Sequence, residues 1–434
     1  MSIPVITVGQ AQEAVVGGLE RLHGPVTVVR RCSELAELMA ACQSGLALAA
    51  VVAEGCEELT ATLVDRLAAV GVSILALTVD PAEVSRLTAI GVVTASTDIE
   101  PSALAMRISD AVGRHGGLVG TRKFPDAGFA DSSAGFQLAP ETREPEAAGS
   151  GRVIAVWGPT GAPGRTLVAV NMAAELAAEG KSVILVDADS YGASVSAMLG
   201  LLEESAGLAQ ACRLADQGLL DSEALDRAAT SVFIKSGGFR VLTGTTRADR
   251  WTELRASALS IVLERAKQVA EVVVVDTGFC LEADEELSFD TMAPRRNGAT
   301  LRSLELADEV FAVGAADAIG VPRLVRGLAE LEAAVPQATP RVLLNKVKRA
   351  SAGRSPRQQL SEAWERFGPG HGVDAYLPAD AEACDAALLS GSVLLESSPD
   401  SPLRKAIAGL VCAPIQQNQK SLGRSSRAFG LLKR

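Results

Sequence analysis

The sequence is poor in several residue types that particular functions require. Of its 434 residues only three are histidine, seven are cysteine and 3% are aromatic. The cysteines form no Cys-x-x-Cys pair, so we expect neither a zinc site nor a disulfide framework, and a reduced setting fits best. No apolar run approaches the ~18 residues that a membrane-spanning helix needs, and the first residues lack the basic region of a signal peptide. We therefore expect a cytoplasmic protein.

Lysine is also scarce. Only nine of the 41 basic residues are lysine, and none of them precedes Lys123. The formal net charge of −11 argues against a chain that coats nucleic acid along its whole length, because phosphate binding requires clustered positive charge. Local basic patches remain compatible with this charge.

Residues 1–113 alternate short apolar segments with amphipathic ones. Strands are predicted at 3–8, 26–30, 47–53, 72–78 and 92–95. Parallel strands need crossover connections, so this rhythm predicts an α/β domain with a doubly wound parallel sheet.

The order of these elements, (βα)5, resembles that of a response-regulator receiver domain. A receiver would carry an acidic pair after the first strand, an aspartate after the third and a lysine after the fifth. Here the first strand ends at Gly9, the third ends at Glu54, and the region contains no lysine. We therefore expect no phosphorylation and favour a pseudo-receiver that serves as a docking or dimerisation module.

Residues 114–150 are rich in glycine, proline, alanine and serine without sustained periodicity, which predicts a flexible linker. From residue 151 the alternation of strands and helices resumes and continues to about residue 413. A strand at 152–157, a glycine-rich turn and a helix at 165–179 follow one another. Unpaired amides and the helix dipole meet in such a turn, which predicts an anion site.

The turn meets the P-loop pattern Gly-x4-Gly-Lys-Ser/Thr only in part. Pro159 stands where the first glycine belongs, Gly164 and Thr166 are in place, and Arg165 replaces the lysine. Further landmarks support the assignment. The apolar strand in 271–279 ends at Asp276, which is typical of a carboxylate that reaches magnesium through water, and a strand at 342–344 ends at Asn345.

With these landmarks, residues 151–413 resemble the MinD/ParA group of P-loop ATPases. A degenerate receiver ahead of such an ATPase is similar to the CpaE and TadZ proteins of Flp pilus systems and to septum-site-determining proteins. The resemblance implies a three-layer, doubly wound P-loop NTPase domain with ATP and Mg²⁺ as cofactors. It further implies an ATP-dependent homodimer that positions pilus-assembly or cell-division proteins at a pole or septum. A ParA-like DNA-partitioning ATPase is the alternative.

The same resemblance implies roles for individual residues. Nucleotide binding falls to Gly158, Thr160, Gly161, Ala162, Pro163, Gly164, Arg165, Thr166, Leu167, Asn345, Pro378 and Asp380. Among these, Asn345 would recognise adenine and the turn 378–380 would close over the base. Magnesium, partly through water, falls to Thr166, Asp187 and Asp276, and catalysis to Asp189 and Arg165. For the two aspartates after the second strand, capping of the following helix is the alternative.

At two positions where ATP-hydrolysing members of this group carry a lysine, this sequence has another residue. Their signature lysine early in the loop aligns with Thr160, and their P-loop lysine aligns with Arg165. Loss of one charge donor costs about 3 kcal/mol of transition-state stabilisation, or ~100-fold in rate. Backbone amides bind phosphate whatever the side chain is, so we expect nucleotide binding with slow or absent hydrolysis. A scaffold without nucleotide is the alternative.

Two basic segments suggest further partners. The tail, residues 414–434, carries five positive charges interleaved with apolar residues, so residues 415–434 could form an amphipathic helix on an anionic membrane surface or an ordinary disordered tail. A second cluster beside Trp251 is the best candidate for DNA binding, although a solvated face with ordinary ion pairs explains it as well. Its members are Arg240, Arg247, Arg250 and Arg255.

Overall fold

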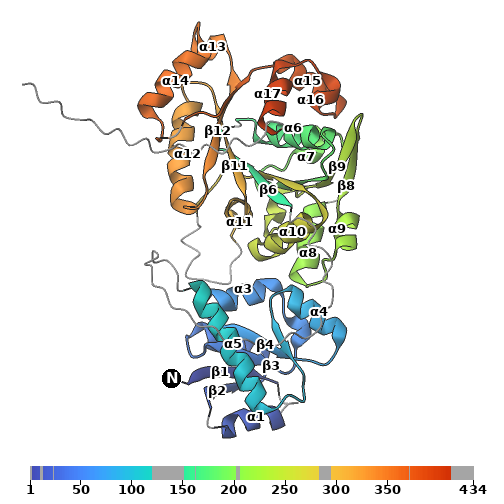
Figure 1. Ribbon diagram of the computed structural model, residues 1–434, viewed down its shortest axis with the longest axis vertical. Coiled ribbons are helices and arrows are strands. Elements are labelled where there is room, and N and C mark those ends of the chain that lie inside the picture. The colour runs from blue at the N-terminus through green and yellow to red at the C-terminus, as the bar shows by residue number, and fades with distance from the viewer. Residues whose placement is uncertain are drawn as a thin grey trace, which may run out of the picture.

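The structure is a computed structural model that describes residues 2–9, 13–22, 24–119, 151–161, 163–201, 206–282, 295–370 and 372–411. It contains two sheets with helices on both faces, which confirms the α/β fold class (Figure 1). The linker predicted over residues 114–150 begins later than expected, because residues 114–119 continue a helix that spans Pro101–Val119. The rest of the predicted linker, residues 120–150, and the whole basic tail lie outside the described residues. No helix in the described part of the chain is both long and apolar enough to cross a bilayer.

The first sheet has five parallel strands in the order β2-β1-β3-β4-β5, the order of flavodoxin-like folds. Its strands are β1 (Ile3–Val8), β2 (Val26–Cys32), β3 (Ala49–Val52), β4 (Ser73–Leu77) and β5 (Val93–Ala95). The helices are α1 (Glu13–Arg21), α2 (Leu35–Gln43), α3 (Ala61–Ala69), α4 (Pro81–Ala89) and α5 (Pro101–Val119). All five predicted strands are present. The apolar run of β3 is completely buried, as expected for a parallel strand covered on both faces.

The second sheet has the order β13-β12-β11-β6-β10-β7-β9-β8. Its strands are β6 (Arg152–Trp157), β7 (Val183–Ala188), β8 (Thr230–Ile234), β9 (Gly237–Leu242), β10 (Val272–Thr277), β11 (Glu309–Ala315), β12 (Pro340–Val347) and β13 (Ala375–Pro378). Its pairs are parallel except for the hairpin of β8 with β9 at one edge. The strand before the glycine-rich turn, β6, therefore lies inside the sheet.

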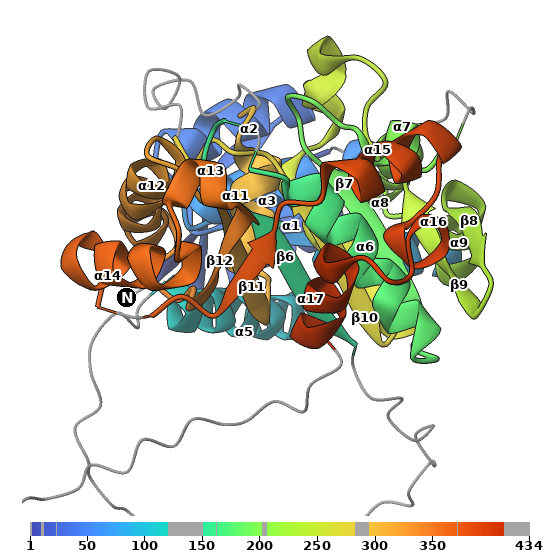
Figure 2. The same cartoon turned by 90° about the horizontal axis from the view of Figure 1, so that it is seen from above.

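Alternate residues of β6 divide the core between the two faces. Ile154 and Val156 pack against helices of one face, namely α6 (Arg165–Ala178), α16 (Leu394–Ser397) and α17 (Pro402–Val411), with α15 (Ala381–Ser390) beside them. Val153, Ala155 and Trp157 pack against the other face, formed by α8 (Gly207–Asp216), α9 (Ser222–Ala228), α10 (Ala256–Val269), α11 (Gly298–Glu305), α12 (Gly320–Ala334) and α14 (Pro356–Phe367). Figure 2 shows the sheet between these layers. This period of two is the expected alternation of a strand.

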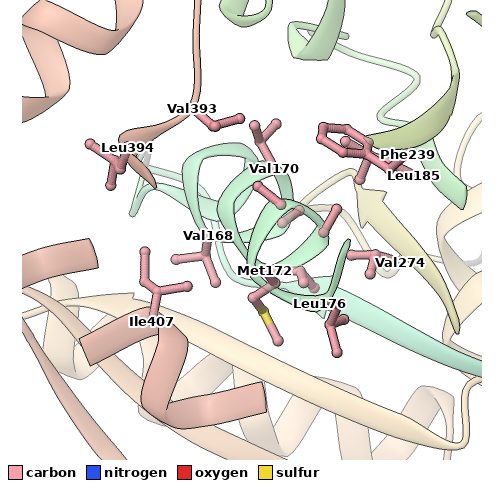
Figure 3. Packing of buried hydrophobic residues seen from close by; sticks show 14 of the residues in the cluster. Val168, Val170, Met172, Leu176, Leu185, Phe239, Val274, Val393, Leu394 and Ile407 are labelled. Atoms are coloured by element: carbon pink, nitrogen blue, oxygen red, sulfur yellow. The ribbon is translucent and has the colours of Figure 1, made fainter. Parts of the chain in front are cut away.

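Helix α6 is buried on all sides because it lies between the sheet and α17. Figure 3 shows its side chains surrounded by residues of strands β7, β9 and β10 and by Val393, Leu394 and Ile407. Two polar side chains of α6 are also buried, and both are paired. Glu175 binds Arg404 of α17 through two contacts of 2.6 Å, and Asn171 Oδ1 accepts a 2.8 Å hydrogen bond from the Leu394 amide. These contacts fix the helix that follows the glycine-rich turn.

Helices α3 and α4 of the first domain contact the second domain at α8 and α10 (Figure 1). The Thr62 amide and hydroxyl donate to Asp216 Oδ1 at 2.8 and 2.5 Å. Arg86 Nη1 donates to the Gln217 carbonyl at 3.1 Å, and Ile261 of α10 packs on the first domain's core. One face of the first domain is thus covered by the second.

Candidate nucleotide-binding site

The loop between β6 and α6, residues 158–164, lies at the carboxyl end of a strand inside the sheet. Gly161 and Gly164 have φ values of 109° and 97°, which L side chains rarely adopt. A Cβ at Gly164 would also lie 2.5 Å from Asn345 Nδ2, and one at Gly158 would lie 2.1 Å from the Val313 carbonyl oxygen. No side chain caps the start of α6, so its first amides are available to an anion. Ala162 lies outside the described residues.

Arg165 is folded back over this loop. Its Nη1 donates to the carbonyl oxygens of Gly158 at 2.9 Å and Pro159 at 3.3 Å, and its Nη2 lies 3.4 Å from Asp189 Oδ2. The side chain is only 11% exposed, and Nε has no partner among the described residues. The guanidinium therefore links the loop to the segment that follows β7.

Two buried carboxylates lie side by side at the ends of neighbouring strands. Asp187 of β7 pairs with Asp276 of β10 in the sheet register, and both are completely buried. Burial raises the pKa of Asp187 to about 7, and the charge of Asp189 adds to the rise while the Val195 and Asp189 amides oppose it. Burial and Asp187 together hold the pKa of Asp276 well above its usual range. Among the described residues no side chain or amide forms a hydrogen bond of ordinary geometry to either oxygen of Asp276, and the nearby Thr166 hydroxyl and Arg165 charge only partly oppose the rise in its pKa.

This arrangement fits a divalent cation such as Mg²⁺. Two adjacent buried carboxylates repel each other, and one of them has both oxygens unsatisfied, which a bound cation would relieve. The Thr166 hydroxyl is an additional oxygen donor near Asp276, and Ser194 Oγ donates to it at 3.4 Å. The described residues contain no group of three His, Cys, Asp or Glu that could hold a metal. An oxygen site of this kind would need phosphate or water to complete it, as Mg²⁺ sites commonly do.

Of Asp187 and Asp189, only Asp187 caps the helix that follows, as the alternative interpretation expects. Asp187 Oδ2 accepts a 3.0 Å hydrogen bond from Val195, the first residue of α7 (Val195–Met198). Asp189 instead caps a turn, because its Oδ1 accepts from the amides of Tyr191 at 2.8 Å and Gly192 at 3.1 Å. Its other oxygen faces Arg165.

Four residues that the sequence motifs did not indicate join this site. The ring of Tyr191 packs on Phe279 with centroids 4.8 Å apart, and the Arg296 guanidinium lies 4.0 Å above it. The Tyr191 hydroxyl donates to Asn297 Oδ1 at 2.8 Å. The segments after β7 and before α11 are therefore tied together. More than 100 residues separate them, so no local spacing could have indicated the contact.

The residues predicted to contact adenine lie in or just after strands β12 and β13. Asn345 is buried, and its Nδ2 donates to the Pro163 carbonyl at 2.8 Å while its Oδ1 accepts from the Lys346 amide. Pro378 pairs with Val347 of the adjacent strand. Asp380 caps α15 through the Ala383 amide and accepts a 2.7 Å hydrogen bond from the Ser401 hydroxyl, so both its oxygens have structural partners. The structure brings Asn345 to the loop and shows no such contact for Asp380.

Each of the four arginines proposed for DNA binding forms an ion pair. Their partners are Asp226 for Arg240, Asp249 for Arg247, Glu253 for Arg250 and Asp216 for Arg255. This arrangement is that of a solvated, charge-compensated face.

Comparison with known proteins bears on the second domain. Residues 150–217 match the model of the ParA family, described as NUBPL iron-transfer P-loop NTPase. Among solved structures, a ParA-family ATPase from Chlorobium tepidum is 19% identical with a TM-score of 0.50, covering 60% of this chain and 98% of its own. The cell-division ATPase MinD from Pyrococcus furiosus is 21% identical (TM-score 0.46; 60% and 97% covered). The Mg-ADP complex of MinD from Pyrococcus horikoshii is 17% identical (TM-score 0.46; 60% and 94% covered). No curated protein matches the chain.

The match to the family model spans the loop, α6, Asp187 of β7 and Asp189 just after that strand. The likeness to the Chlorobium structure extends over 60% of the chain. Together with the strand order and the loop geometry, these findings show that the second domain has the fold of a ParA-type P-loop NTPase.

Proposed function

We propose that the chain is an ATP-binding spatial regulator that works as a nucleotide-dependent switch. The observation that carries this proposal is the buried Asp187–Asp276 pair, unsatisfied at Asp276, beside Thr166 at the head of α6. Such a pair destabilises the protein unless a cation binds it, and uncompensated groups of this kind are typical of functional sites.

The residues present would divide the task of holding ATP and Mg²⁺. Phosphates would bind to the amides of residues 158–167, and the base would lie between Asn345 and the turn at 378–380. Magnesium would bind to Thr166, with Asp187 and Asp276 acting directly or through water. When bound, the cation would neutralise phosphate charge. Asn345 would exchange its hydrogen bond to Pro163 for one to the base.

Hydrolysis is proposed to be slow. Arg165 keeps a positive charge at the loop, but its planar fork is already engaged by two carbonyls and Asp189. Thr160 carries no charge. ATP would therefore act chiefly by favouring one conformation or assembly of the chain, because a ligand shifts an equilibrium by its differential affinity for the two states.

We further propose that the switch is a homodimer that localises pilus-assembly or cell-division proteins. Residues 1–113 would serve as a docking module, and residues 415–434 would add peripheral contact with the inner face of the cell membrane. DNA partitioning is the second candidate. The ion pairing of all four arginines in the proposed DNA patch supports the first candidate over it.

Calorimetric titration of the full chain with ATP, with and without Mg²⁺, tests the nucleotide proposal. We expect binding that Mg²⁺ strengthens and that Thr166→Ala weakens in its presence. The matched control is Thr230→Ala on the distant β8 strand. No binding to the wild-type chain at millimolar ATP would favour a scaffold without nucleotide.

Microscopy of the tagged chain and a DNA co-sedimentation assay distinguish the two roles. A focus at a pole or septum without DNA binding supports the proposed localisation. Salt-sensitive binding to nonspecific DNA that requires ATP would support the partitioning role instead.

A further inference from the structure

Arg323 lies beside Gly161 of the glycine-rich loop and has no role in the site described above. Helix α12 follows β11 after the short turn 316–319 and carries Arg323 against Gly161. A Cβ built at Gly161 would lie 2.6 Å from Arg323 Nη1, so the guanidinium contacts the loop backbone. Arg323 thus reaches the loop from a helix that follows it by more than 150 residues.

The guanidinium of Arg323 keeps its hydrogen-bonding groups available. The side chain is half-buried and forms no hydrogen bond or ion pair within 4 Å with any residue that the structure describes. Arg165 differs, because its guanidinium is held by Gly158, Pro159 and Asp189. An arginine is always charged and has five N–H donors, so a half-buried one without a partner favours binding of an anion.

The surroundings of Arg323 add a second cation. Asp317 Oδ1 accepts hydrogen bonds from the Gly320 and Ile319 amides at 2.7 and 2.9 Å. These two amides, with Lys346 and Arg323 nearby, lower the pKa of Asp317. Lys346 has a φ of 61°, a strained conformation for a residue with a side chain. Two cations from separate elements therefore act on this one carboxylate.

These residues line a cavity of about 410 Å³. Its wall includes Thr160 and Gly161 of the loop, Asp317 and Arg323 of the α12 region, and Ser351. The cavity therefore combines loop backbone, a hydroxyl and an available guanidinium. Phosphate oxygens suit this combination, because a guanidinium binds phosphate through two parallel N–H donors.

We propose that this cavity is a phosphate subsite in which Arg323 binds the phosphate groups of a nucleotide and thereby discriminates ATP from ADP. The inference rests on the proposed nucleotide binding. Thr160 is uncharged, and Arg323 places a positive charge in the cavity that both residues line. Arg165 instead lies on the other side of the loop, beside Asp189. The phosphates belong either to the nucleotide in the same chain or to that of a second copy.

Titration of full-length variants with ATP and ADP in Mg²⁺ tests the subsite. Arg323→Ala is expected to weaken ATP binding about tenfold or more, with a smaller effect on ADP, because a charge-assisted hydrogen bond is lost. Arg323→Lys is expected to restore part of the affinity. The matched control is Arg326→Ala, on the exposed side of the same helix, which should bind as the wild type does.

Protein concentration separates the two sources of phosphate. A loss of ATP affinity in dilute, monomeric protein assigns the phosphates to the chain's own nucleotide. Unchanged dilute affinity with loss of ATP-dependent dimerisation in light scattering assigns them to the second copy. If the wild type binds ATP and Arg323→Ala matches it in both measurements, the subsite is overturned while the proposed function stands. If the wild type binds no nucleotide, the proposed function fails, and this inference with it.

Discussion

Arg165 Nη2 and Asp189 Oδ2 lie 3.4 Å apart, and both side chains are nearly buried at the head of α6. The pair joins the phosphate loop to the segment after β7, two regions that the proposed chemistry needs to act together. The positive charge of Arg165 is thereby paired with a carboxylate of the same chain. Under the proposed function, phosphate would separate this pair or share the Arg165 guanidinium with Asp189.

Arg165→Lys is expected to increase ATP hydrolysis by about tenfold or more, because an ammonium is more compact than a guanidinium and can lie between phosphate groups. The measurement is phosphate release at saturating ATP. Adding Asp189→Ala to this variant should remove the gain. A wild-type turnover already comparable to that of ordinary MinD-type ATPases, and lost in Asp189→Ala, would contradict the proposed slow hydrolysis.

Asp276→Asn is expected to raise the free energy of unfolding of the ligand-free protein by about 1–3 kcal/mol at pH 8, because it removes a buried charge without a partner. The pKa values of Asp187 and Asp276 are raised in the folded state. The unfolded chain therefore loses its protons first, and stability falls as the pH rises from about 4 through about 7. Urea unfolding at pH 5 and pH 8 should show a larger gain at pH 8. A destabilised variant at pH 8 would show that the carboxylate has a stabilising role.

Glu175→Ala is expected to destabilise the chain by about 3–5 kcal/mol, because it leaves Arg404 without its carboxylate in the contact between α6 and α17. Denaturant unfolding measures the loss. Glu223→Ala, which removes an exposed partner of Arg227, provides the control and should cost less than about 1 kcal/mol. Equal effects of the two substitutions would contradict a special role of the buried pair.

Asp216→Ala is expected to weaken the contact between the two domains by about 1–3 kcal/mol, since the Thr62 amide and hydroxyl lose their acceptor. Hydrogen exchange at the Thr62 amide should become faster, and small-angle scattering should report a larger radius of gyration. Asp226→Ala breaks an ion pair elsewhere in the second domain and is the control. Unchanged exchange at Thr62 would show that the apolar contacts of Ile261 suffice.

Much of the fold could be predicted from local patterns. The predicted strands recur in the structure with ends shifted by a few residues, because short apolar runs between amphipathic segments encode buried parallel strands directly. The predicted helix after the glycine-rich turn ends at Ala178, one residue before the predicted end. The two edge strands β8 and β13 lie outside the predicted set, since neither carries a run of buried apolar residues.

The sequence by itself determined the α/β class, the position of the glycine-rich loop and the presence of Thr160 and Arg165 in and beside it. Each of these depends on residues that are near one another in the chain. Only the tertiary structure decided that Arg165 pairs with Asp189, that Asp276 lies unsatisfied beside Asp187, and that Arg323 reaches Gly161. Those contacts join residues far apart in the chain. The order of strands in the sheet brings them together, and no local periodicity records that order.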